Sequence, residues 1–244
     1  MKAYRLLRAD EIECRISSCN QYGVQILLYK DARVDMNLLD EVHGSFGWQN
    51  DYQLIDGQLF CTVEVWDDQK QQWIRKQNVG TESFTEKEKG RASDAFKRAC
   101  FNLGIGRELY TAPSMFVFKK DLKTLKEDQN GRWTCKDWFT VDQLEYDGER
   151  IAYVVIRNQK TDECIEFGEP VQAKNEREAL EDRCIGEAKA AVLRSRMRSE
   201  CIDAEKLLSS YGVTGTSELT EKQFSQIFNH WAEVKQYCGK ETEE

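Results

Sequence analysis

The sequence predicts an α+β fold in which an antiparallel β-hairpin/meander sheet packs on a long helix, followed by a small C-terminal helical module. Three observations predict this fold. Apolar and polar residues alternate over residues 58–66, which is typical of a half-buried strand. An apolar stripe with helical spacing follows residues 86–103. After residue 175 the apolar residues recur at helical spacing.

The first third of the chain predicts a strand, a helix and a hairpin. An apolar run at residues 24–29 predicts a short strand. Residues 33–43 predict a helix that ends at Gly44, the residue type favoured just after a helix. Residues 58–66 and 73–79 predict two strands joined by a polar turn.

A long helix is predicted over residues 86–103. Thr85 and Glu88 have the spacing of a capping box at its start, and Gly104 marks its end. Its apolar stripe consists of Ala92, Ala95, Phe96, Ala99 and Leu103.

A meander is predicted after this helix. Residues 138–146 and 150–158 predict two strands, and the Asp-Gly pair at 147–148 is a strong hairpin signal between them. Residues 164–167 predict a third strand. We therefore expect the α+β core to cover residues 1–167.

The rest of the chain is expected to form a linker, 168–175, and a helical module with an acidic tail, 176–244. The helical pattern runs to about residue 209, with a break near Glu200. Thr220 and Gln223 form a second capping box, which begins a final helix. One face of that helix carries Phe224, Ile227, Phe228 and Trp231.

The composition indicates a globular protein and leaves nucleic-acid binding open. The hydrophobic fraction is 40% and the net charge is −8. Overall acidity does not exclude a nucleic-acid partner, because the local field at a groove governs phosphate binding. Positive charge gathers at residues 87–107 and 119–136.

The sequence predicts no membrane association. No apolar run approaches the roughly 18 residues of a membrane span. The first ten residues lack the apolar stretch of a signal peptide. The expectation is a soluble protein in the cytoplasm, and the motifs described below suggest a bacteriophage or prophage protein in a bacterial host.

The nine cysteines are scattered without a C-x-x-C pair, and His43 and His230 stand far from one another in the sequence. This pattern favours free thiols in a reducing compartment over a metal site. No metal or other cofactor is expected.

One face of the predicted long helix is basic. Lys87, Arg91 and Arg98 lie within about 40° of one another at 100° per residue, and Lys97 lies to one side. Such a face can line a groove with cations that meet phosphates. The alternative is an ordinary solvated face on which Asp94 pairs with Arg98, and the pattern alone favours this alternative.

Three blocks of sequence change that balance. Residues 91–110 (RASDAFKRACFNLGIGRELY) closely resemble the signature of phage and bacterial proteins in the Rad-fifty-two-like single-strand annealing superfamily. Residues 33–48 (RVDMNLLDEVHGSFGW) resemble the early arginine, helix and Gly-Trp of that family. Residues 56–65 (DGQLFCTVEV) and 78–83 (NVGTES) agree in order and spacing. The resemblance covers residues 29–113.

The resemblance implies a homo-oligomer, a ring or an arc, with single-stranded DNA in a continuous basic groove. Arg33 matches the groove arginine of the family, and Lys97 with Arg98 matches the Lys-Arg pair that contacts the DNA backbone. One departure concerns Phe101, where eukaryotic members often place another arginine. Either the groove is less basic here, or nearby cations replace that charge. The candidate DNA-binding residues are therefore Arg33, Lys87, Arg91, Lys97, Arg98 and Arg107.

The implied function is annealing of complementary strands in recombination and double-strand break repair. Phosphate contacts leave the base edges free to be tested against a second strand. No bond is made and no nucleotide is needed, so the protein is not expected to be an enzyme. The segment Gly104-Ile-Gly106 lacks the Lys-Ser/Thr of a P-loop.

Three alternatives remain. The protein could protect 3′ ends without annealing. It could be a metal-dependent nuclease that uses Asp137, Asp142 and Glu145, although these lie at mixed parity on a strand. The C-terminal helices could also recruit a partner exonuclease or a single-strand binding protein, as an added function.

For two further features an ordinary structural role is favoured over DNA binding. Residues 119–126 are rich in lysine and could form a second DNA-binding surface, but a solvated loop or helix is favoured. The tryptophans could stack on bases, but packing in the core or at a subunit interface is favoured for most of them.

Overall fold

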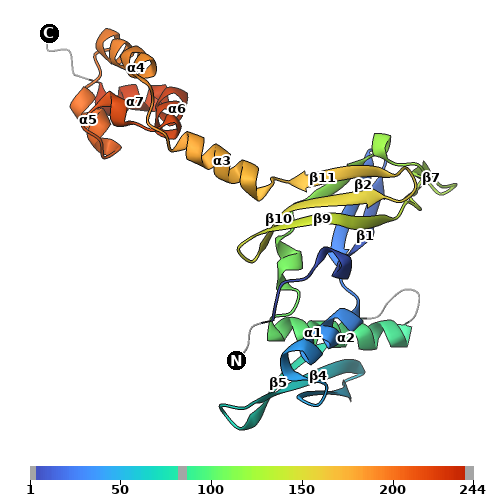
Figure 1. Cartoon of the computed structure of the whole chain (residues 1–244). Helices are drawn as coiled ribbons and strands as arrows, with labels where there is room; N and C mark the ends of the chain where they lie inside the picture. Colours follow the sequence, from blue (N-terminus) through green and yellow to red (C-terminus); the bar gives the residue numbers. More distant parts are fainter. Residues whose placement is uncertain (1–3, 82–86, 240–244) are drawn as a thin grey trace. The chain divides into compact units, whose positions relative to one another are not determined.

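The computed structural model describes residues 4–81 and 87–239. Its contacts divide the chain into two units, Met1–Val171 and Gln172–Glu244, each described by itself here. Antiparallel sheets and helices together make a mixed α+β protein, which confirms the predicted class (Figure 1). No helix among the described residues has the length and apolar character required to cross a bilayer.

A three-stranded antiparallel sheet in the first unit has the order β3-β4-β5. The predicted hairpin is confirmed as β4 (Gln58–Asp67) and β5 (Gln72–Val79). The sequence analysis missed β3 (Trp48–Ile55), which pairs with β4 along its whole length. Most of β3 is exposed, so it lacks the apolar alternation that reveals a half-buried strand.

Two helices cover one face of this sheet: α1 (Ala32–His43) and α2 (Lys87–Leu103) (Figure 1). Gly44 and Gly104 follow their last residues, as predicted. The expected capping box of Thr85 and Glu88 lies outside the described residues. The shared core includes Leu38 and Leu39 of α1, Ala95, Phe96 and Ala99 of α2, and Cys61, Val63 and Val65 of β4.

The second sheet has six strands in the order β11-β10-β9-β1-β2-β6. The predicted hairpin and the predicted meander therefore lie in separate sheets. The strand predicted at 24–29 and the three strands of the meander are confirmed. The sheet consists of β1 (Glu13–Asn20), β2 (Gly23–Tyr29), β6 (Met115–Phe118), β9 (Phe139–Asp147), β10 (Arg150–Asn158) and β11 (Glu163–Gly168).

The sequence analysis missed β1, and its irregularity explains why. Its register against β2 shifts between Ile16 and Ser18, so the side chains do not alternate cleanly. Only Cys14, Ile16 and Cys19 of β1 pack toward the core of the sheet. The strand is therefore specified mainly by its hydrogen-bonding neighbours β2 and β9.

Several side chains join the two cores of the first unit. Leu28, Leu109, Val141 and Leu144 pack against both clusters of buried residues. Hydrogen bonds add to this contact: Leu7 N donates to Glu108 Oε1 at 2.8 Å, and Tyr146 Oη donates to Leu7 O at 2.8 Å. Short 3-10 turns at Ala9–Glu11 and Arg107–Thr111 flank these contacts.

Between β6 and β9 the chain forms an arm, residues 119–136. It contains a 3-10 turn, Lys119–Asp121, and a two-stranded ribbon, β7 (Lys126–Glu127) with β8 (Trp133–Thr134). The buried carboxylate of Asp137 anchors its base. Asp137 accepts hydrogen bonds from Lys123 N at 2.8 Å, Thr124 Oγ1 at 2.5 Å and Asn158 Nδ2 at 2.9 Å.

The expected linker 168–175 is largely helical, because α3 (Val171–Glu181) begins inside it. None of the residues of α3 is buried. Pairs of side chains spaced four residues apart stabilise this polar helix, as expected for a helix without an apolar face. These pairs are Gln172 with Glu176, Lys174 with Glu178, and Arg177 with Glu181.

The rest of the second unit is a helical module with its own core, which includes Leu193, Leu207, Ile227 and Trp231. The predicted break near Glu200 is confirmed, but a further break at 182–186 and one at His230 divide the predicted helices. The capping box of Thr220 and Gln223 is present. Its helices are α4 (Glu187–Ser199), α5 (Ala204–Ser210), α6 (Glu221–Asn229) and α7 (Trp231–Cys238), with a 3-10 turn at Thr216–Glu218.

The substitution Asp137→Asn is expected to destabilise the first unit by about 1–3 kcal/mol at neutral pH, because it leaves buried donors unsatisfied. Burial raises the pKa of Asp137, but hydrogen bonds from Thr124, Lys123 and Asn158 outweigh it and hold the pKa below the usual value. The charged carboxylate therefore stabilises the fold above its unfolded pKa, and this contribution disappears as the pH falls through the folded pKa.

Urea unfolding of both forms from pH 7 to pH 3 measures this effect. The difference in unfolding free energy should shrink on acidification. The exposed Asp68→Asn serves as the control. A difference that stays constant with pH would contradict the role assigned to the Asp137 carboxylate.

Candidate nucleic-acid interface

Arg33 lies in the first turn of α1 with its side chain 83% exposed. Its Nε donates to Asp31 Oδ1 at 2.7 Å, and its backbone N–H donates to the same oxygen at 2.9 Å. Asp31 thus both caps α1 and orients the Arg33 guanidinium. Both Nη groups of Arg33 have no hydrogen-bond partner within the described ranges, so they face solvent with donors available.

The charge of Lys97 on α2 acts on Asp31 as well. The pKa of Asp31 lies below its usual value because of the hydrogen bonds from Arg33 and, as a smaller contribution, the charge of Lys97. The Lys97 ammonium is therefore near the start of α1. The structure thus brings together two candidate cations that are far apart in the sequence and belong to different helices.

Arg98 pairs with Asp94, which is the arrangement that the helical pattern alone favoured. Its Nε donates to Asp94 Oδ2 at 2.9 Å, one turn earlier on α2. The same carboxylate oxygen accepts from Thr81 N at 2.8 Å and from Thr81 Oγ1 at 2.9 Å. Arg98 is 47% exposed, so it takes part in a helix-to-loop contact and still presents part of its guanidinium to solvent.

Arg91 and Arg107 are bound to backbone carbonyls. Arg91 Nη2 donates to Gly57 O at 2.6 Å, in the turn between β3 and β4. Arg107 Nε donates to Phe101 O at 2.9 Å, and its guanidinium lies over the Phe101 ring. Arg107 therefore caps the C-terminus of α2 and stacks on Phe101. The Lys87 side chain is outside the described part of the chain; its backbone begins α2.

Lys30, after β2, and Asp35 of α1 form a buried salt bridge: Lys30 Nζ lies 2.5 Å from Asp35 Oδ1, and the side chains are only 7% and 0% exposed. Burial raises the pKa of Asp35 to about 6, against the opposing charges of Lys30 and Lys97. Gly106, at φ 75°, leaves room for the lysine, because a Cβ there would lie 2.3 Å from Lys30 Cε. This agrees with the close packing expected at that glycine.

The sequence analysis missed the Lys30–Asp35 pair. A signal was present, because Asp35 is three and four residues before Leu38 and Leu39, which are both buried. An acidic residue on the apolar face of a helix predicts a buried partner. Two cations precede Asp35 closely in the sequence, Arg33 and Lys30, and only Lys30 immediately follows an apolar strand.

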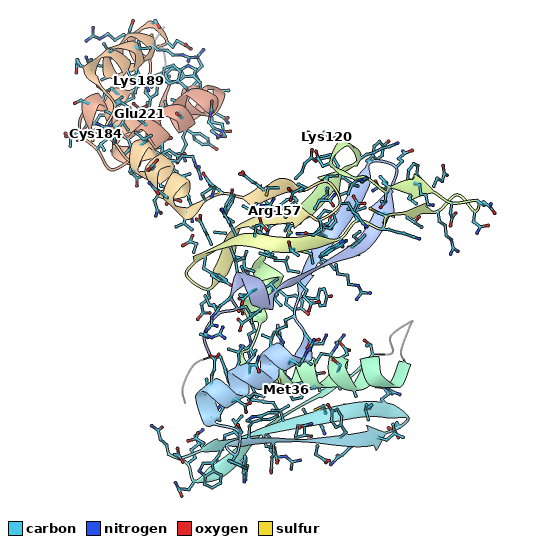
Figure 2. The ribbon with its side chains drawn as sticks, turned by 45° about the vertical axis from the view of Figure 1, so that its right-hand side comes forward. Met36, Lys120, Arg157, Cys184, Lys189 and Glu221 are labelled. Carbon is cyan, nitrogen blue, oxygen red and sulfur yellow. The ribbon has the colours of Figure 1, made fainter. Side chains whose placement is uncertain are left out.

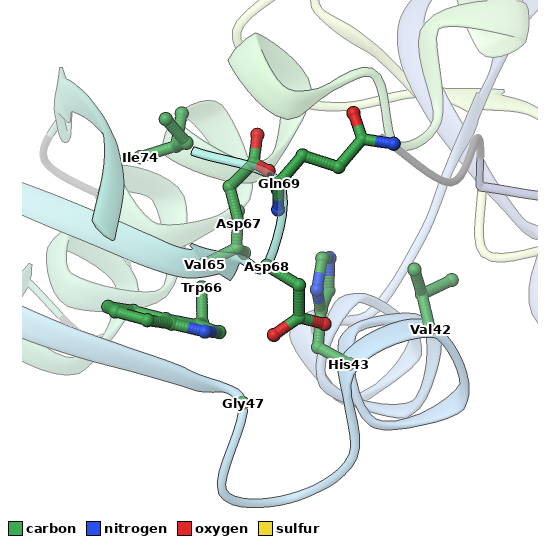
Figure 3. A pocket seen from close by; sticks show the side chains of 9 residues that line it. All are labelled: Val42, His43, Gly47, Val65, Trp66, Asp67, Asp68, Gln69 and Ile74. Atoms are coloured by element: carbon green, nitrogen blue, oxygen red, sulfur yellow. Dashed lines mark hydrogen bonds between the residues drawn. The ribbon is translucent and has the colours of Figure 1, made fainter. Parts of the chain in front are cut away.

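A cavity of about 470 Å³ lies near the other end of α1 (Figure 3). Its lining includes His43, Trp66, Asp67 and Asp68. His43 Nε2 is 2.9 Å from the hydroxyl of Tyr4. Asp67 Oδ1 accepts from the backbone of the β4–β5 turn, Gln69 N and Lys70 N. The pocket holds none of the candidate DNA-binding residues.

The carboxylates considered for a nuclease are each engaged elsewhere. Asp137 anchors the arm, Asp142 pairs with Arg157 at 2.5 Å, and Glu145 accepts from Val171 N at 2.8 Å. In residues 4–81 and 87–239, no three side chains of the His, Cys, Asp or Glu types lie close enough to hold a metal ion. The nuclease alternative gains no support from this geometry.

The chain matches no protein-family model and no curated protein sequence. The interpretation of the interface therefore depends on its own sequence blocks and geometry.

Lys30→Met is expected to destabilise the first unit by about 3–5 kcal/mol at pH 8, because it leaves the Asp35 carboxylate buried without its cation. Loss of that cation raises the Asp35 pKa further. The folded variant then binds a proton more readily than the unfolded chain, so its stability increases as the pH falls.

Urea unfolding at pH 8 and pH 5 tests this expectation, and the deficit relative to the unmodified protein should be smaller at pH 5. The double substitution Lys30→Met/Asp35→Leu is the matched control and should recover most of the loss at pH 8. An equal deficit at both pH values would contradict the role of Asp35 charge.

Proposed function

We propose that this protein binds single-stranded DNA and promotes the annealing of complementary strands, with no bond chemistry and no cofactor. The observation that carries the proposal is that Arg33 binds Asp31 at the start of α1, while the charge of Lys97 on the packed helix α2 also acts on Asp31. The Rad-fifty-two-like blocks of the sequence assign Arg33 to the DNA groove and Lys97, with Arg98, to contact with the DNA backbone. Their proximity in the fold supports that assignment independently of the sequence resemblance.

The local chemistry suits a phosphate. Arg33 offers two Nη donors, and Lys97 adds a second positive charge close by. The first turn of α1 adds the partial positive charge of a helix N-terminus. The Asp31 carboxylate already binds Arg33, so a phosphate oxygen would have to compete with it for that guanidinium.

Phosphate contacts explain how such a surface could speed annealing. A strand held through its backbone keeps its base edges free for a second strand. Cations also offset the repulsion between two phosphate backbones. Repetition of the surface in a homo-oligomer, a ring or an arc, would extend the strand and remove hairpins, which is the arrangement that we propose for recombination and break repair in a bacterial cytoplasm.

The second unit has a separate place in this proposal. Its compact core, distinct from that of the first unit, suits a docking module for a partner exonuclease or a single-strand binding protein. Lys189 of α4 pairs with Glu221 of α6 at 2.5 Å (Figure 2), so part of the basic face of α4 is neutralised within the module.

The first test is fluorescence-monitored annealing of two complementary oligonucleotides. The protein should pair them faster than they pair spontaneously, and Lys97→Ala/Arg98→Ala should lose this acceleration while it remains folded. Each alanine at Arg33 or Lys97 should reduce the slope of log K against log salt by about 0.7, the value for one phosphate contact on a single strand.

The double substitution Lys70→Ala/Lys206→Ala changes two exposed lysines that belong to neither α1 nor α2 and is the matched control. Tight binding without acceleration would favour 3′-end protection instead. No binding to single-stranded DNA would contradict the proposal.

Asp31→Asn is expected to tighten single-stranded DNA binding several-fold at low salt. The substitution removes a negative charge beside Arg33 and Lys97 and retains a side chain that caps a helix well. Fluorescence anisotropy with a labelled oligothymidine measures the affinity. Asp10→Asn, an exposed position without a candidate cation beside it in the sequence, controls for the change in net charge. Unchanged or weaker binding by Asp31→Asn would contradict the assignment of Arg33 and Lys97.

A further inference from the structure

The arm, residues 119–136, is rich in basic residues. It contains six Lys or Arg residues and three Asp or Glu residues, in a chain with a net charge of −8. Figure 2 places Lys120 at the end of the six-stranded sheet. Asp137 binds the backbone of the arm at its base, not the charged groups of its lysines.

The cations of the arm differ from those around α1 and α2 in their partners. Among the described residues, no arm lysine or arginine forms a salt bridge with a carboxylate. Lys119 lies 5.4 Å from the centre of the Trp133 ring, and Lys123 Nζ is 3.5 Å from Lys160 O. By contrast, Arg33 and Arg98 each pair with a carboxylate.

One acidic residue of the arm shapes its tip. Asp128 Oδ1 accepts from Asn130 N and from Arg132 N, both at 2.8 Å, and so stabilises the turn between β7 and β8. At the base, Asp137 holds the backbone of Lys123 and Thr124. The lysines are therefore displayed on an ordered scaffold, and their charge is not cancelled by partners within the scaffold.

Three large aromatic side chains are exposed at the same end of the sheet. Tyr22, Phe118 and Trp138 are 65%, 58% and 55% exposed. Lys119 N donates to Tyr22 O at 2.8 Å, and Phe118 lies opposite Gly23 in the β2–β6 pairing. Trp138 directly follows Asp137, the anchor of the arm. Exposed rings and cations without a carboxylate partner thus lie at the end of the sheet that carries the arm.

We propose that the arm and the end of the sheet that carries it bind single-stranded nucleic acid. Phosphates would lie on Lys119, Lys120 and Lys123, and bases would stack on the exposed rings. Unpaired lysines bind phosphate without breaking an internal ion pair, and exposed rings stack on any base. The binding surface is separate from Arg33 and Lys97 and goes beyond the proposed annealing site. An anionic membrane is a less suitable partner, because isolated rings between polar groups lack the continuous apolar face that inserts into lipid.

The test compares three variants of the full-length chain by anisotropy of a labelled oligothymidine over a range of salt concentrations. In the arm variant, Lys119→Ala/Lys120→Ala/Lys123→Ala, affinity should fall at least tenfold at low salt, and the log–log salt slope should become shallower by about 2. The ring variant, Phe118→Ala/Trp138→Ala, should lose affinity with an unchanged slope. The control variant, Lys70→Ala/Lys206→Ala/Lys222→Ala, should match the unmodified protein.

The same assay with Lys97→Ala/Arg98→Ala separates this inference from the proposed function. Loss of binding in that variant but not in the arm variant would overturn the inference and leave the proposed function intact. Loss in the arm variant alone would support the inference and count against the α1–α2 site. Equal affinity for duplex and single-stranded oligonucleotides, or preferential binding to phosphatidylserine vesicles, would also overturn it. Thermal unfolding at the same temperature as the unmodified protein identifies variants that are folded.

Discussion

The buried salt bridge between Lys30 and Asp35 is the interaction on which the arrangement of the first unit depends. Lys30 directly follows β2 of the six-stranded sheet, and Asp35 belongs to α1, which covers the three-stranded sheet. The pair therefore lies where the chain passes from one sheet to the other. Two buried charges are costly unless they meet in good geometry, so they tolerate few alternative packings of these elements. Gly106 completes the constraint by leaving space beside the lysine.

The first unit presents positive charge in two different ways. Around α1 and α2, the carboxylates of Asp31 and Asp94 hold arginines in fixed positions and reduce their net charge. Such cations are well oriented, but each has an internal competitor for any phosphate. The lysines of the arm form no salt bridge with a carboxylate in the described part of the chain. A chain with a net charge of −8 can therefore attract a polyanion, because its acidic groups are placed unevenly.

The sequence predicted the elements that have clear periodicity or turn signals, such as the β4–β5 hairpin, α2 and the β9–β11 meander. It could not predict β1 and β3, since one is irregular and the other is an exposed edge. The separation into two sheets depends on long-range pairing that local patterns do not encode. Arg33 and Lys97 could be named from the sequence, but the part of Asp31, whose carboxylate both charges act on, could not. The carbonyl partners of Arg91 and Arg107 likewise follow from tertiary structure alone.

The solvent-exposed helix α3 has a mechanical consequence. None of its residues is buried, so its own hydrogen bonds and side-chain pairs must keep it helical. An isolated helix of 11 residues is marginal in water, and each exposed ion pair contributes only about 0.3–0.5 kcal/mol. Because salt screens these pairs, the helix content of α3 is expected to decrease as ionic strength rises. The same ion concentration that controls phosphate binding thus also sets how firmly α3 is held in its helical form.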